Sequence, residues 1–237
     1  MASTFVLVHG AWHGGWCWRR VADRLQAAGH RVFCPTLTGL GERAHLLTRN
    51  VGLDTHIADV IALLEAEELT DVVLVGHSYA GTVITGVADA AKARLKKLVY
   101  FDAAIVEDGE CWSSHAIPAI AAERRRLAKE TSDGVSMPVP DAAVFGIPDA
   151  ADRAWVQRRM TPHPFKPFDQ VMHWRNPIGN GLPRLYIDCV DPVYANLSAV
   201  KAKFRGQPGW PFVALKAGHD AMVSAPEAVA RLLLEAA

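Results

Sequence analysis

The sequence predicts an α/β fold, in which a doubly wound, mostly parallel six-stranded sheet carries an inserted helical cap. Short apolar runs alternate along the chain with helix-length amphipathic segments, which is typical of a parallel sheet. This alternation stops after Asp102 and resumes at Arg184, which indicates an insertion. We expect a core of residues 1–103 and 183–237 and a cap of residues 104–182.

The expected strands are short apolar runs, each long enough for a buried strand. They cover residues 4–8, 31–34, 72–75, 97–101, 184–188 and 211–215. Apolar residues at helical spacing predict helices over residues 16–28, 54–68, a small-residue segment that ends at Ala91, and 226–235. In the insertion, which holds eight of the 14 prolines, helical patterns are confined to residues near 115–130 and 150–160.

The balance of charge argues against nucleic acid as a partner. Lys and Arg together number 25, as do Asp and Glu, so no basic excess is present to bind a phosphate backbone. The one basic run, at residues 124–126, is interpreted as the solvated face of an amphipathic helix. The first residues carry no positive charge and lead directly into a strand, so we expect a cytoplasmic protein without a membrane partner. A homodimer is left open.

A serine follows the third expected strand directly, within residues 76–81 (GHSYAG). A serine between small residues at a strand-to-helix turn is typical of a nucleophile elbow, whose strained backbone projects the hydroxyl above the sheet. The alternative is a plain turn in which Ser78 caps the next helix. Because a base and an acid are also available, we predict that Ser78 is a nucleophile.

The base must come from one of ten histidines. His219 follows the last expected strand, on the loop that enters the C-terminal helix, so it should lie over the strand ends near Ser78. For the acid that orients it, Asp191 is preferred, because it lies just past a strand and follows the order serine, acid, histidine. Asp102 and Asp188 remain alternatives.

A glycine-rich loop, residues 9–16 (HGAWHGGW), follows the first expected strand. In an elbow enzyme one amide of this loop and the amide after the nucleophile bind the oxyanion, which assigns the backbone N–H groups of Ala11 and Tyr79 to an oxyanion hole. Neither a Gly-x-Gly-x-x-Gly nor a Gly-Lys-Ser/Thr pattern is present, so nucleotide binding is disfavoured. The scattered cysteines indicate no metal site.

Residues 8–16, 76–81 and 218–226 (GHDAMVSAP) together resemble the α/β-hydrolase superfamily. They are most similar to its methyl esterase and hydroxynitrile lyase branch, which includes salicylate-type methyl esterases and related bacterial carboxylesterases. The resemblance implies the α/β-hydrolase fold, a helical cap over the site and no cofactor. It also implies a serine carboxylesterase that works through an acyl-enzyme. Because no arginine cluster marks an anionic acyl group, we expect its substrates to be small-to-medium neutral apolar or aromatic esters.

Two alternatives to the esterase follow from the same resemblance. Lyases of the branch use a lysine directly after the histidine and a threonine in the first loop, where this sequence has Asp220 and Ala11. A negative side chain near developing cyanide would repel it, which favours ester hydrolysis. The second alternative is a ligand receptor that keeps the fold without turnover.

Six of the seven tryptophans lie either in the first loop and helix or in the expected cap. This clustering predicts an aromatic-walled pocket for a small-molecule ester. We expect Trp12 and Trp112 to face the substrate.

Overall fold

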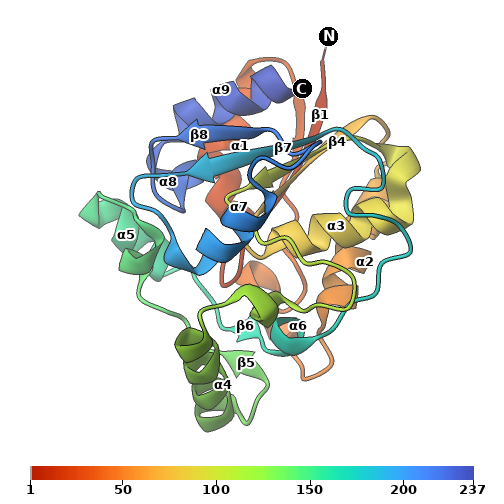
Figure 1. Cartoon of the computed structure of the whole chain (residues 1–237). Coiled ribbons are helices and arrows are strands. Elements are labelled where there is room, and N and C mark those ends of the chain that lie inside the picture. Colours follow the sequence, from red (N-terminus) through yellow and green to blue (C-terminus); the bar gives the residue numbers. More distant parts are fainter. Residues whose placement is uncertain (1) are drawn as a thin grey trace.

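The computed structural model describes residues 2–237 and confirms the predicted fold class. Its main sheet has the strand order β2-β1-β3-β4-β7-β8, with every neighbouring pair parallel (Figure 1). The strands are β1 (Thr4–Val8), β2 (Arg31–Phe33), β3 (Val72–His77), β4 (Leu95–Phe101), β7 (Arg184–Cys189) and β8 (Phe212–Leu215). Each of the six expected runs therefore forms a strand of this sheet.

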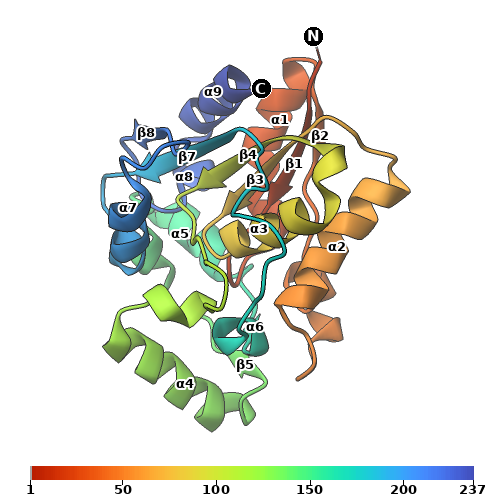
Figure 2. The same ribbon diagram turned by 45° about the vertical axis from the view of Figure 1, so that its right-hand side comes forward.

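Helices cover both faces of the sheet, which explains why its central strands are apolar without alternation. Helices α1 (Arg19–Ala27) and α9 (Pro226–Ala236) pack together on one face, and α2 (Leu53–Ala66) and α3 (Ala80–Ala91) pack together on the other (Figure 2). Every residue of β3 is buried between these layers. The strand that leads to Ser78 is thus held rigidly from both sides.

Shorter helices complete this part of the chain. They are α7 (Ser198–Phe204), α8 (Ala221–Ser224) and the 3-10 helices η1 (Gly15–Trp18), η2 (Gly41–Leu46), η3 (Lys92–Arg94) and η6 (Ala195–Leu197).

Most of the segment between β4 and β7 lies beyond the carboxyl ends of the main strands, and its last residues run back past α3 to the start of β7 (Figures 1 and 2). It contains helices α4 (Pro118–Ser132), α5 (Ala150–Gln157) and α6 (Lys166–Asp169), with η4 (Trp112–His115) and η5 (Ala142–Phe145). A small antiparallel pair, β5 (Ser136–Met137) and β6 (His163–Pro164), joins its two halves. The two predicted helical stretches match α4 and α5. The division of the chain at residues 103 and 183 into core and cap stays a prediction.

Within residues 2–237, no helix combines the length and the apolar character that crossing a membrane requires.

Two fully buried histidines, His9 and His56, are held as neutral rings by their burial. His9 donates from Nδ1 to the Gly10 carbonyl and accepts the Leu37 amide at Nε2, 3.0 Å away. His56 donates from Nε2 to the Thr38 carbonyl, so its Nδ1 accepts the hydroxyl of Tyr79 at 2.9 Å. Burial lowers the pKa of His9 to about 3 and that of His56 to about 4.

These shifts predict that the protein loses stability as the pH falls below about 6.5, the ordinary pKa of histidine. Between that pH and about 4, the unfolded chain binds protons that folded His56 refuses, so each pH unit removes up to about 1.4 kcal/mol per such group. Replacing His56 by Gln should flatten the dependence of the unfolding free energy on pH, measured by urea denaturation. The same change at exposed His173 is the control, and an unchanged slope in both variants would contradict the prediction.

Candidate active site

Ser78 sits on a strained turn between β3 and α3. Its φ is 53°, in the left-handed region, and its carbonyl accepts the amides of Gly81 and Ala104. The small neighbours are required by close approach, because a Cβ at Gly76 would lie 2.6 Å from the Ala80 carbonyl oxygen and one at Gly10 would lie 2.8 Å from the Cβ of Ser78. This is the geometry expected of a nucleophile elbow.

His219 meets Ser78 as the sequence predicts. Its Nε2 lies 2.9 Å from the Ser78 hydroxyl oxygen, and the residue is 1% exposed. The loop that carries it is packed closely, since a Cβ at Gly218 would lie 2.2 Å from the Gly146 carbonyl oxygen. The base is therefore placed within hydrogen-bond reach of the nucleophile by backbone packing.

The acid beside His219 is Asp102, and the prediction of Asp191 is wrong for this position. The Nδ1 of His219 donates to a carboxylate oxygen of Asp102 at 2.6 Å. Asp191 is exposed two residues past the end of β7, where only its backbone amide is engaged, with the Ala217 carbonyl. Asp102 directly follows β4, the neighbour of β3, so the sheet itself brings its carboxylate next to the base.

Asp102 is fully buried, yet its surroundings favour the charged form. Burial raises the pKa of this carboxyl, but the hydrogen bond and charge of His219 and the ammonium of Lys201 together lower it below its ordinary value. The Cys189 amide donates to the same carboxylate at 3.2 Å. A negative Asp102 holds His219 in the tautomer whose Nε2 can accept the serine proton.

Lys201 is a partner of the acid that the sequence reasoning missed. Its ammonium lies 2.5 Å from Asp102 and 2.8 Å from Asp188, and the residue is 6% exposed. Asp188 also pairs with the half-exposed Arg205. Asp188, the third acid considered from sequence, is thus paired with two cations and does not contact His219. The sequence could have indicated this role, because the spacing of Leu197, Lys201 and Phe204 places a lysine on the apolar face of a helix.

A second buried ion pair involves Asp220, the residue that follows His219. His13 donates from Nδ1 to the Ala11 carbonyl at 2.7 Å and from Nε2 to Asp220 at 2.9 Å, which requires the protonated ring. Burial lowers the pKa of His13, but the Asp220 charge raises it above its ordinary value overall. The carboxylate of Asp220 therefore points to His13.

His77 links this pair to the base. Its Nε2 donates to the carbonyl of His219 at 3.1 Å, and the two rings lie 4.6 Å apart. Burial lowers the pKa of His77 to about 3, so it stays neutral beside the base. The loop after β1 and the loop after β8 are joined through these contacts.

The two amides assigned to the oxyanion hole flank the nucleophile. Tyr79 directly follows Ser78, and Ala11 follows Gly10, which approaches the Cβ of Ser78. Within residues 2–237, neither amide donates to a backbone carbonyl. Both are thus available for a ligand, and their catalytic role stays a prediction.

A narrow pocket, partly open to solvent, reaches Ser78. Trp12 and Trp112 both line it, with ring centroids 6.4 Å apart, as expected from sequence. Tyr194 completes the wall and stacks on His219 with centroids 4.1 Å apart. Contact of the two tryptophans with a substrate stays a prediction.

One group of potential metal ligands stands out within residues 2–237, formed by His77, His219 and Asp220. Both ring nitrogens of His219 are already engaged, one by Asp102 and the other by Ser78. Nε2 of His77 is engaged by the His219 carbonyl. Of the three residues, His219 is thus fully engaged by hydrogen bonds of the site.

The buried ammonium behind Asp102 predicts a specific pH effect. In Lys201→Met, the acid limb of the pH profile of kcat/KM should shift to higher pH by about one unit. Without the lysine, the negative charge of Asp102 acts more strongly on His219 and favours its protonated form. The other groups that face this cluster are Asp188, Arg205, His77 and Asp220. The pH profile of ester hydrolysis measures the shift.

Two control variants accompany this experiment. Lys201→Arg keeps the charge and should keep the acid limb near its original pH, while Arg205→Met removes a half-exposed charge one contact further away and should move it less. A folded Lys201→Met enzyme with an unmoved acid limb would show that the lysine only fills space.

Comparison with known proteins agrees with the fold. The chain is 42% identical over 245 aligned residues to the carbendazim hydrolyzing esterase of Nocardioides sp. strain SG-4G, with 98% of each protein covered. It is 36% identical over 100 residues, 42% of this chain and 39% of the relative, to the alpha-hydroxynitrile lyase of Arabidopsis thaliana.

Among solved structures, an extracellular alpha/beta-hydrolase from a Paenibacillus species superposes with a TM-score of 0.85 at 23% identity, covering 99% of this chain and 98% of that one. It is described as homologous in structure and function to tobacco salicylic acid binding protein 2. At this identity the likeness shows the fold. A sequence model of the alpha/beta hydrolase family matches residues 5–232. The resemblance to the methyl esterase and hydroxynitrile lyase branch is confirmed, and the chain belongs to the alpha/beta hydrolase family.

Proposed function

We propose that this chain is a serine carboxylesterase that hydrolyses small-to-medium neutral apolar or aromatic esters through an acyl-enzyme on Ser78. The observation that carries the proposal is the continuous hydrogen-bond chain from Ser78 through His219 to Asp102, which opens into an aromatic-walled pocket. The 42% identity to an esterase over nearly the whole chain supports the same activity.

In the first half of the reaction, Nε2 of His219 takes the proton of Ser78 as the serine oxygen attacks the ester carbonyl carbon. The amides of Ala11 and Tyr79 donate to the oxyanion that forms. When the tetrahedral intermediate collapses, the bond to the alcohol oxygen breaks and His219 gives its proton to the departing alcohol. The acyl group is left on Ser78.

In the second half, water takes the place of the alcohol. His219 removes a proton from the water as it attacks the acyl carbonyl, and the proton then passes to Ser78 as the acid leaves. Asp102 stabilises the imidazolium that forms in each half, and Lys201 and the Cys189 amide keep this carboxylate in place.

The lyase alternative is not favoured. The position after the histidine holds Asp220, whose carboxylate is buried against His13, so no cation from this position faces the pocket. The alanine at position 11 has no hydroxyl to bind the cyanohydrin oxygen. Cytoplasmic location and a homodimer stay predictions.

Replacement of Ser78 by alanine tests the esterase proposal. The variant should fold and still bind esters, but hydrolysis of p-nitrophenyl and methyl aryl esters should fall by several orders of magnitude, because the nucleophile is gone. A fluorophosphonate should label wild-type protein at Ser78, located by peptide mapping.

Ser198→Ala is the matched control, since it removes another hydroxyl outside the site and should leave both readouts unchanged. Stable ligand binding with at most one slow turnover in the wild type would favour a receptor. Labelling at any other serine would contradict the assignment of the elbow.

A further inference from the structure

Three consecutive arginines on α4 have different surroundings. Arg125 forms an ion pair with Asp169 at 2.7 Å, and Arg126 pairs with Glu123 at 2.7 Å and Glu130 at 2.6 Å. These two fit the solvated face interpreted from sequence. Arg124 does not: it is half-buried and lines the pocket that reaches Ser78.

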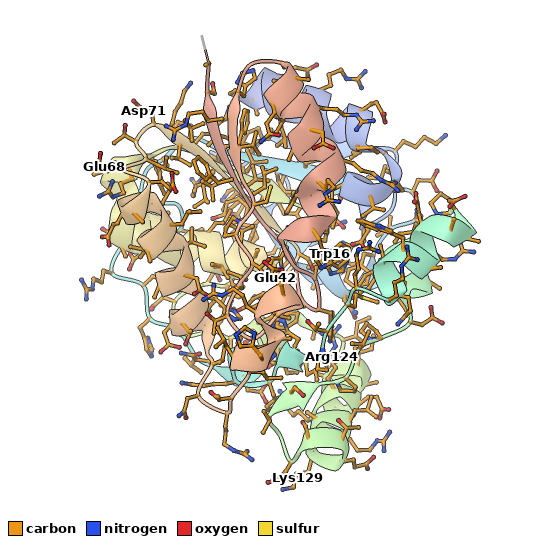
Figure 3. The ribbon with its side chains drawn as sticks, turned by 180° about the vertical axis from the view of Figure 1, so that it is seen from behind. Trp16, Glu42, Glu68, Asp71, Arg124 and Lys129 are labelled. Carbon is orange, nitrogen blue, oxygen red and sulfur yellow. The ribbon has the colours of Figure 1, made fainter. Side chains whose placement is uncertain are left out.

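The guanidinium of Arg124 lies against aromatic rings. Its central carbon is 5.3 Å from the ring centroid of Trp12 and 5.5 Å from those of Trp112 and Phe168. Figure 3 shows Arg124 where α4 meets the body of the molecule, whereas Lys129 of the same helix lies at its outer end. The side chain therefore extends inward over the tryptophans of the pocket.

Ring faces leave the N–H groups of a guanidinium without acceptors. Within residues 2–237, no carboxylate lies within ion-pair distance of Arg124 and no side-chain hydrogen bond engages it, in contrast to both of its neighbours. A guanidinium carries five N–H donors in a planar fork, and donors in a confined pocket favour a ligand that can accept them.

Arg124 also stands between two cavities. A second, mostly apolar cavity of about 310 Å³ lies beside the first, and Trp12, Arg124, Tyr194 and Asn196 line both. Of these four, only Arg124 carries a charge. A planar substrate that extends from Ser78 toward the second cavity must pass its guanidinium.

We propose that Arg124 determines substrate preference by donating to a hydrogen-bond acceptor on the aromatic part of the ester, such as a ring nitrogen or a carbonyl oxygen. The inference rests on the proposed esterase function and names its substrate class more closely. Trp12 and Trp112 confine the guanidinium, whose central carbon lies 5.3 and 5.5 Å from their ring centroids, so an acceptor on the aromatic part of a substrate in this pocket can meet its N–H groups.

Isosteric esters test this preference. Methyl 2-naphthoate and the isomeric methyl quinolinecarboxylates share shape and reacting group, and the quinolines add one ring nitrogen. We expect at least one quinoline isomer to exceed the naphthoate in kcat/KM by about tenfold, the value of one hydrogen bond to a charged donor. In Arg124→Met this preference should disappear, because the quinoline ester loses far more than the naphthoate.

Arg126→Met is the matched control on the same helix, and it should keep the wild-type preference. Arg124→Lys, which has the charge without the fork, should keep part of it. Equal losses for both esters in Arg124→Met, or the absence of any preferred quinoline in the wild type, would overturn the proposal and leave Arg124 as a packing residue of the cap.

The experiment also separates a wrong assignment of Arg124 from a wrong assignment of the esterase activity. If Ser78-dependent turnover is absent for every ester, calorimetric binding of the same esters to the Ser78→Ala protein still tests Arg124. Tighter binding of a quinoline that is lost on adding Arg124→Met would support the proposal, and identical affinities would overturn it. Hydrolysis and recognition are thus tested separately.

Discussion

The buried carboxylate of Asp102 is the group on which the arrangement of the site depends. A lone charge at 0% exposure would be strongly unfavourable, so the fold must supply partners from every neighbouring element. His219 comes from the loop after β8, Lys201 from α7, and the Cys189 amide from the end of β7. Pairing this one charge therefore holds three segments, all far from Asp102 in the sequence, next to its carboxylate. Because one of the partners is the base, the same pairing places Nε2 of His219 against the hydroxyl of Ser78.

A second buried carboxylate, Asp220, directly follows the base in the chain and is also paired. Its partner His13 belongs to the glycine-rich loop, whose Ala11 carbonyl also accepts from that ring. The loop proposed to bind the oxyanion and the loop that carries the base are thus tied by one protonated histidine. His219 has two buried anions beside it, each with its own cation, which limits how far either loop can move relative to Ser78.

The sequence was sufficient for the fold because each strand of the main sheet coincides with a short apolar run, most clearly in the buried β1 and β3. It was sufficient for Ser78 and His219 because chain order and loop position leave few rivals. It was not sufficient for the acid. Asp102 and Asp191 both follow strands, and the difference lies in how the chain leaves the strand: Asp102 comes immediately after β4, beside β3, whereas Asp191 comes two residues after β7 and is exposed. Ion pairs across the fold, such as that of Lys201, and the inward direction of Arg124 depend on packing between segments that no local pattern records.

The pairing of His219 with Asp102 can be observed directly as the far-downfield proton NMR resonance of the histidine Nδ1–H that donates to a carboxylate. The account predicts that this resonance is present in the wild type, persists in Asp191→Asn and is lost in Asp102→Asn, with both variants folded. Loss of the resonance in Asp191→Asn and its persistence in Asp102→Asn would contradict the assignment of the acid and, with it, the arrangement of the proposed triad.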